Sequence, residues 1–139
     1  MLDNYCKQVR IEANTMIYMA QRMIIPAIEA YVGRLCKTIE GKKAVASDIS
    51  CESEIDVVRK LSGFSDGMYK KVEELKKIHE KTGEIESVLD QSKAIRDEML
   101  PVMDELRCFA DNAEEMVGRV CWPLPSYGEL LNHSGIVPS

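Results

Sequence analysis

The amino-acid sequence predicts an all-α protein built from three long helices. Apolar residues recur at alternating steps of three and four along most of its 139 residues, which places them on one face of a helix. Eight glycines, five prolines and an aromatic content of 6% are low, and this composition favours helices over a β-sandwich or barrel. With 45% hydrophobic and 29% charged residues, the chain can bury a core. We therefore expect a single helical domain over residues 1–131.

The first helix is expected at residues 2–40. Its apolar stripe begins with small side chains and continues with larger ones: Val9, Ala13, Met16, Ala20, Met23 and Ala27, then Ile24, Ile28, Tyr31, Leu35 and Ile39. Pro26 cannot donate a backbone hydrogen bond to the carbonyl of Arg22, so a kink is expected there. Gly41 is the predicted C-cap, and residues 42–51 are expected to form a loop.

The second helix is expected at residues 53–81, with Ser50 or Ser53 as its cap. Its stripe keeps the same spacing: Val58, Leu61, Ser65, Met68, Val72, Leu75, His79 and Thr82. Gly63 and Gly67 each weaken this helix by about 1 kcal/mol relative to alanine. The sequence therefore predicts a helix that is less stable near these two positions.

The third helix is expected at residues 84–120. Its stripe has the most regular spacing in the sequence: Ile85, Val88, Ser92, Ile95, Met99, Val102, Leu106, Phe109, Ala113, Met116 and Val120. The short break at Thr82 and Gly83 makes the second and third helices antiparallel neighbours, so an up-down-up bundle or coiled-coil-like arrangement is predicted. Pro101 lies in a Leu-Pro-Val-Met stretch that echoes Ile-Pro-Ala-Ile around Pro26, and a second kink is expected there.

An apolar segment without helical spacing follows at residues 121–131. Two prolines one residue apart favour an extended chain, and the segment's aromatic and aliphatic side chains need apolar surface to pack against. That surface belongs either to the chain's own bundle or to another protein. The candidate interaction residues are Trp122, Pro123, Pro125, Tyr127, Leu130 and Leu131. Residues 132–139 are expected to form a frayed tail.

Composition and charge argue against several partners. The net charge of −5 is the wrong sign for a protein that binds nucleic acid. The apolar stretch from Met16 to Ala30 is interrupted by polar residues well below the ~20 residues of a membrane span. Five cysteines without a CxxC pair indicate reduced thiols in a cytoplasmic protein.

The sequence also lacks recognisable catalytic motifs. It contains no glycine-rich phosphate loop, nucleophile elbow or Cys/His motif. Lys76 and Leu130 stand three residues before His79 and His133, so the Glu-x-x-His pattern of a di-metal bundle is absent. For His79 on the apolar stripe, a hydrogen-bonded or rim histidine is favoured over a metal ligand. We therefore assign no catalytic, cofactor-binding or metal-binding residue.

Short motifs along the chain resemble a known family. Asn4-Tyr5, Ile11-Glu12-Ala13, Thr15-Met16, Met19-Ala20 and Ile25-Pro26-Ala27 resemble the start of the C-terminal helical region of type III glutamine synthetases, the large bacterial form of that enzyme. Arg96-Asp97, Pro101-Val102-Met103, Leu106-Arg107 and the Trp-Pro-Leu-Pro-Ser-Tyr-Gly-Glu-Leu-Leu stretch at 122–131 are similar to that family's chain end. The last stretch is the most specific of these motifs.

This resemblance implies a parent enzyme that makes glutamine from glutamate, ammonia and ATP, uses magnesium or manganese, and forms a ring-based oligomer. The family's metal, nucleotide and glutamate ligands lie in an upstream catalytic domain, so no cofactor is expected in this chain. The chain is then a non-catalytic domain that supports folding or assembly, with the catalytic domain, other subunits or a second copy as partners. A free-standing helical adaptor is the alternative, and an enzyme with an unrecognised site is a third hypothesis.

Overall fold

The computed structural model describes residues 1–118 and 121–124, and every regular element within them is helical. The first rod consists of α1 (Leu2–Met19), the π-helical turn η1 (Ala20–Ile24) and α2 (Ile25–Val45). The second rod is α3 (Glu52–Gly83), and the third consists of α4 (Val88–Ala94), the π-helical turn η2 (Ile95–Met99) and α5 (Leu100–Met116). The all-α prediction is confirmed for these residues.

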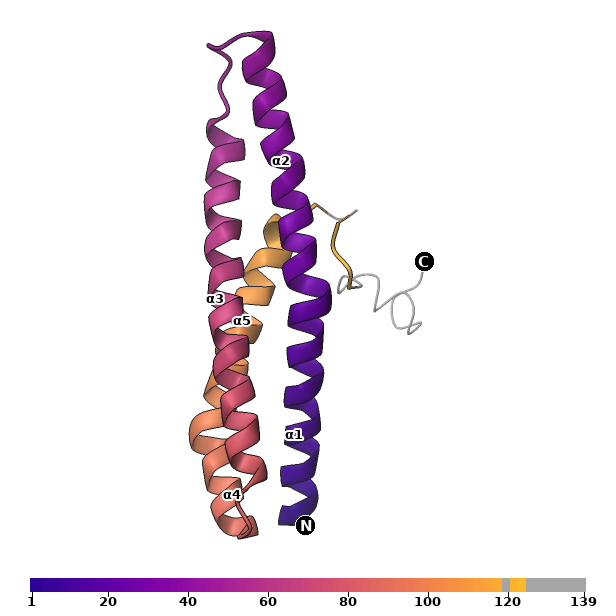
Figure 1. The fold of residues 1–139 in the computed structure, drawn as a ribbon, viewed down its shortest axis with the longest axis vertical. Coiled ribbons are helices and arrows are strands. Elements are labelled where there is room, and N and C mark those ends of the chain that lie inside the picture. Colours follow the sequence, from indigo (N-terminus) through magenta and orange to yellow (C-terminus); the bar gives the residue numbers. More distant parts are fainter. Residues whose placement is uncertain (119–120, 125–139) are drawn as a thin grey trace, which may run out of the picture.

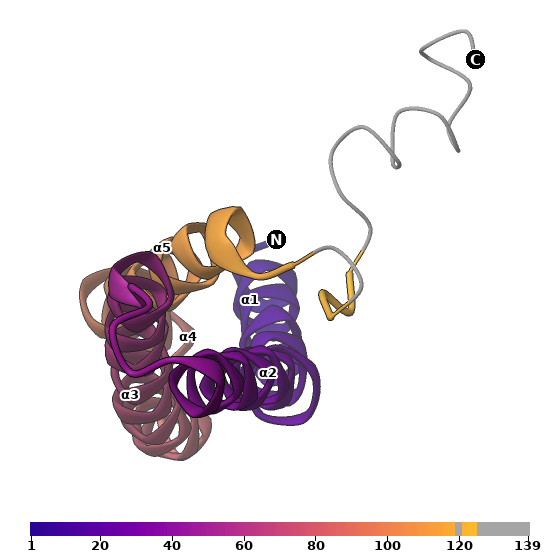
Figure 2. The same cartoon turned by 90° about the horizontal axis from the view of Figure 1, so that it is seen from above.

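The three rods pack around a shared core. In Figure 1 the chain rises along α1 and α2, descends along α3 and rises again along α4 and α5. The view from above places the first rod, α3 and α5 at the corners of a triangle (Figure 2). The α2 helix and the beginning of α3 extend beyond the end of α5, so this part of the molecule is a two-helix hairpin (Figure 1).

The first helix is longer than predicted. It continues through Gly41 and ends at Val45, so the predicted C-cap was wrong and the loop comprises residues 46–51. Glycine within a helix costs about 1 kcal/mol, and the following turn offsets this cost. There the Nζ atom of Lys43 donates hydrogen bonds to the carbonyls of Ser47 and Ile49, at 3.2 and 2.7 Å. A cation at the helix C-terminus also interacts favourably with the helix dipole.

An ion pair joins the two sides of the hairpin. Lys42 Nζ lies 2.7 Å from Glu54 Oε1, between the last turn of α2 and the first turn of α3. The hydrogen bond from Lys42 lowers the pKa of the Glu54 carboxyl. Beside this pair the Cys51 side chain is buried. These contacts hold the hairpin together beyond the end of the three-helix core.

The other helix ends also differ from the predicted ones. The α3 helix is continuous through Gly63 and Gly67, and ends at Gly83 rather than residue 81. The third rod begins at Val88 rather than 84, because the Ser87 side chain caps it by accepting a hydrogen bond from the Asp90 N–H at 3.3 Å. It ends at Met116 rather than 120, since Val117 adopts an extended conformation in which its side chain is buried.

Each internal proline follows a π-helical turn. Pro26 follows η1, where the Ile25 N–H bonds to the carbonyl of Ala20, five residues earlier. Pro101 follows η2, with the equivalent bond from Leu100 to Ile95. A proline ring crowds the carbonyl four residues before it, and a wider turn relieves this contact. At both prolines, where a kink was predicted, the structure has a local widening of the helix, and the bend itself stays a prediction.

The core lies along one face of each rod. Fully buried large side chains come from all three rods: Ile28, Leu61, Met68, Val72, Leu75, Ile95, Met99 and Leu106. In the first rod Ile17 and Ile24 are buried, whereas Met16 and Met23, predicted on the stripe, are half-buried. A strict three-four repeat drifts by about 20° per heptad relative to a straight helix, so the buried face moves to the next residue.

A polar junction ties α1 to the last turn of α3. Arg10 Nη2 donates a hydrogen bond to the His79 carbonyl at 3.2 Å, and the buried Thr82 hydroxyl donates to the same oxygen at 3.1 Å. From α4, Gln91 Nε2 donates to the Thr82 carbonyl at 2.8 Å. Helix C-terminal carbonyls need such donors because they have no partner within the helix. Burial, and secondarily the Arg10 charge, lowers the pKa of His79.

Two glycines of α3 give a matched pair of variants. A Cβ at Gly67 would lie 2.5 to 2.9 Å from ring carbons of Phe109 on α5, whereas Gly63 has open space within 4 Å. We expect Gly63→Ala to stabilise the chain by up to about 1 kcal/mol through helix propensity. Gly67→Ala should be less stable than wild type, since overpacking typically costs about 1–3 kcal/mol. Urea unfolding measures both, and equal stabilisation by the two variants would contradict the close contact.

The lowered pKa of His79 predicts that the stability of the chain depends on pH. Its pKa is lowered from 6.5 in the folded chain, so the unfolded state binds a proton more readily. The free energy of unfolding is therefore highest above about pH 6.5. It falls as the pH drops from 6.5 toward the pKa of His79 in the folded chain. We expect His79→Gln to flatten this part of the profile, measured as melting temperature between pH 7 and 5. An identical slope in both proteins would show that other groups cause it.

Candidate interaction surface

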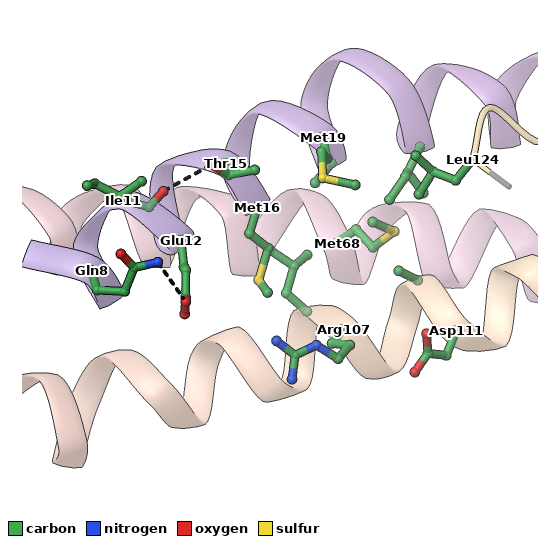
Figure 3. A pocket seen from close by; sticks show the side chains of 14 residues that line it. Gln8, Ile11, Glu12, Thr15, Met16, Met19, Met68, Arg107, Asp111 and Leu124 are labelled. Atoms are coloured by element: carbon green, nitrogen blue, oxygen red, sulfur yellow. Dashed lines mark hydrogen bonds between the residues drawn. The ribbon is translucent and has the colours of Figure 1, made fainter. Parts of the chain in front are cut away.

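An apolar groove of about 520 Å³ lies between α1 and α5, and is called the α1/α5 groove below. Its walls are apolar side chains from several parts of the chain: Met16, Met19, Leu106, Ala110 and Leu124, with Met68 of α3 between them. Figure 3 shows the labelled side chains of α1 along one side, and Arg107 and Asp111 of α5 along the other. Leu124 lies at the end away from Gln8 (Figure 3).

The groove forms beside the core because the first rod turns small side chains of α1 and η1 inward. Ala13 and Ala20 are buried, and Ile17 lies between them on the core face. This leaves Met16 and Met19 half-buried on the neighbouring face, toward α5. Ile11, which also lines the groove, is 60% exposed. Apolar surface of this kind is suited to contact with another apolar segment.

The polar rim of the groove makes its hydrogen bonds locally. Gln8 Nε2 donates to Glu12 Oε1 at 3.3 Å, and the Thr15 hydroxyl donates to the Ile11 carbonyl at 3.1 Å, both within α1. On α5, Arg107 Nη1 lies 3.5 Å from Asp104 Oδ1 in an exposed pair, which contributes little to stability. The Arg107 guanidinium therefore keeps donors for a further partner.

The titratable side chains of the described residues do not gather into a metal-binding cluster. Within residues 1–118 and 121–124 there is no group of three or more His, Cys, Asp or Glu side chains that could hold a metal ion. The five cysteines are free, with Cys6 and Cys51 buried. The apolar lining of the groove suits contact with another apolar surface. In the same part of the chain, none of the helices combines the length and apolar character that crossing a bilayer requires.

The beginning of the predicted interaction segment lies against the bundle. Trp122 and Leu124 are half-buried and pack against the hydrophobic core cluster, whereas Pro123 is exposed. Trp122 Nε1 is buried without a hydrogen-bond partner among the described residues. Arg34 of α2 donates to Cys121 Sγ at 3.3 Å, which holds the start of the segment beside the first rod.

The remaining predicted interaction residues, Pro125, Tyr127, Leu130 and Leu131, lie outside the described residues. The interaction role of the segment therefore stays a prediction.

The groove was not predicted from the sequence. Met16 stands on the predicted apolar stripe, yet its side chain is half-buried in the groove wall, whereas Met68 and Met99 on the other stripes are fully buried. The sequence feature that could have indicated the groove is a pair of apolar residues, Ile11 and Met19, which lie beside the predicted stripe. Several motifs that carry the family resemblance line the groove: Ile11-Glu12, Thr15-Met16, Met19-Ala20 and Leu106-Arg107.

Comparison with known proteins supports that resemblance. Residues 1–43 match the family model of the glutamine synthetase C-terminal domain. The chain is 31% identical to a glutamine synthetase of Butyrivibrio fibrisolvens over 131 residues, which are 94% of this chain and 19% of the relative. It is 25% identical to a type-3 glutamine synthetase of Dictyostelium discoideum, again over 94% of this chain, and here it covers 18% of the relative.

A glutamine synthetase of Bacteroides fragilis is 22% identical over 94% of the chain. The chain thus spans about a fifth of the length of the curated relatives it matches. The resemblance seen in the sequence is confirmed, and the chain is related to the C-terminal domain of the glutamine synthetase family.

Proposed function

We propose that this chain is the non-catalytic C-terminal helical domain of a type III glutamine synthetase and supports the fold or oligomer assembly of that enzyme. The observation that carries the proposal is similarity along 94% of the chain to proteins about five times longer, one of them named a type-3 glutamine synthetase. The parent enzyme would ligate ammonia to glutamate with ATP and magnesium or manganese. This chain would bind none of these cofactors.

The partners in this proposal are the catalytic domain or other subunits of the parent enzyme. A second copy of the chain is a further partner. The parent would act in the cytoplasm, in keeping with the five free thiols of this chain. The segment with Trp122, Pro123, Pro125, Tyr127, Leu130 and Leu131 would serve as an interaction element. Trp122 and Leu124 are the described part of this segment. Their packing against the hydrophobic core cluster supports this role.

A free-standing helical adaptor is the second candidate, and the apolar lining of the α1/α5 groove favours it as a surface that an apolar segment can occupy. The DNA upstream of the Met1 codon discriminates between the two functions. A continuous reading frame that encodes a catalytic domain supports the first, whereas a start codon preceded by an unrelated frame supports the adaptor. In the parent enzyme, loss of ring assembly on deletion of residues 1–131, measured by mass photometry, would further support the first.

The proposal predicts that the isolated chain has no measurable affinity for ATP. Nucleotide binding needs an anion-cradling loop, and the bound magnesium needs carboxylate ligands, neither of which the sequence motifs provide. Isothermal titration with ATP and magnesium should therefore give only heats of dilution. Saturable one-to-one binding would contradict the non-catalytic assignment.

Because Trp122 packs against the bundle, we expect that truncating its side chain destabilises the chain. Truncating a fully buried tryptophan costs about 3–5 kcal/mol, and Trp122 is half-buried, so Trp122→Ala should cost roughly 1–3 kcal/mol. The melting temperature of the chain should fall by several degrees. Tyr69→Ala is the matched control, since the Tyr69 side chain is 60% exposed and should change the melting temperature little. Equal melting temperatures for wild type and Trp122→Ala would contradict packing of this ring on the bundle.

A further inference from the structure

We propose that residues 125–131 of this chain occupy its own α1/α5 groove. The inference rests on the proposed role of the Trp122–Leu131 segment and names the surface to which it docks. It is tested on the isolated chain, so its failure can be distinguished from a failure of the proposed role in a glutamine synthetase. The upstream reading frame and the ATP titration test that role separately.

The first argument is the position of the chain where residue 125 begins. Leu124 already lines the groove, and Trp122 beside it packs against the core cluster. In Figure 3 Leu124 lies at one end of the groove and Gln8 at the other. A chain that leaves Leu124 along the groove therefore runs over Met19 and Met16 toward Gln8. Continuity with Leu124 favours this segment over an unconnected partner.

The second argument is length. Gln8 and Ala20 both line the groove and are twelve residues apart on the first rod, a rise of about 18 Å at 1.5 Å per residue. Seven residues in extended conformation span up to about 23 Å. Residues 125–131 are therefore long enough to follow the groove from Leu124 to its far end.

The third argument is chemical complementarity. Methionine side chains are flexible and adapt to irregular apolar partners, and Met16 and Met19 are half-buried in the wall. The segment offers three large apolar residues, Tyr127, Leu130 and Leu131. The rim carries the carboxylates Glu12 and Asp111 beside Arg107, so the segment's one charged residue, Glu129, finds a partner of opposite sign at Arg107, whose guanidinium has donors to spare. Pro125 restricts the backbone and lowers the entropy lost on docking.

Peroxide oxidation of the full 139-residue chain tests the proposal, because methionine oxidation follows solvent exposure. The readout is the rate of sulfoxide formation at Met16 and Met19, measured by peptide mass spectrometry. Met23 is the matched reference, since it is half-buried on the same rod and does not line the groove. Met1 is fully exposed and Met99 is fully buried, so their oxidation rates give the upper and lower limits for the chain.

We expect Met16 and Met19 to oxidise several-fold more slowly than Met23 in the wild-type chain. In the double variant Leu130→Asp with Leu131→Asp, their rates should rise several-fold while the Met23 rate stays constant. Ile136→Asp, outside residues 125–131, is the control and should leave all rates unchanged. Continued protection of Met99 in each variant verifies that the bundle is folded.

Two results would overturn the proposal. Unchanged rates at Met16 and Met19 in the double variant would show that residues 125–131 do not cover the groove. Protection that disappears on dilution, together with a dimer mass in light scattering, would assign the groove to a second copy of the chain.

Discussion

Two of the three rods contain an internal proline and must nevertheless keep an unbroken apolar face against α3. The structure meets this constraint with a π-helical turn that ends two residues before each proline, η1 before Pro26 and η2 before Pro101. Each turn contributes buried side chains, Ile24 in η1 and both Ile95 and Met99 in η2. The widened turns thus keep the apolar stripes directed at the core where an interrupted helix would have lost them. The α3 helix contains no proline, and serves as the common packing partner of α2 and α5.

The unequal lengths of the rods follow from where the third rod ends. Because α5 ends at Met116, the far part of α2 and the start of α3 contact each other without a third helix, and no residue of α2 beyond Ile28 is buried. The chain then leaves α5 toward the first rod, with Val117 buried and Gly118 close to the Tyr31 ring. A Cβ at Gly118 would lie 2.8 Å from that ring, so a residue without a side chain suits this crossing. After the crossing, Trp122 packs against the core cluster and Leu124 lines the end of the α1/α5 groove.

Helical periodicity predicted the number of rods, their order and most of the α3 core, since Leu61, Met68, Val72, Leu75 and Thr82 are all buried. It failed at the helix ends, where tertiary contacts decide. Lys43 satisfies carbonyls beyond Gly41, and the Ser87 cap starts the third rod four residues late. It also failed at the groove, because a stripe identifies the face that points inward and not the distance between two helices. The assignment of Met16 to the core shows this limit, since the same spacing suits a core wall and a groove wall.

The lining of the α1/α5 groove determines which kind of contact an occupant makes there. Its walls are apolar and its rim forms hydrogen bonds within α1, so recognition there depends on buried apolar area more than on directed polar contacts. A separate partner would have to offset the loss of translational and rotational freedom, and stable interfaces between proteins usually bury about 1,200–2,000 Å². A segment joined directly to Leu124 avoids most of that loss, because a short tether gives an effective concentration in the millimolar range. A tethered segment therefore binds such a groove at a lower entropic cost than a freely diffusing partner with the same contacts.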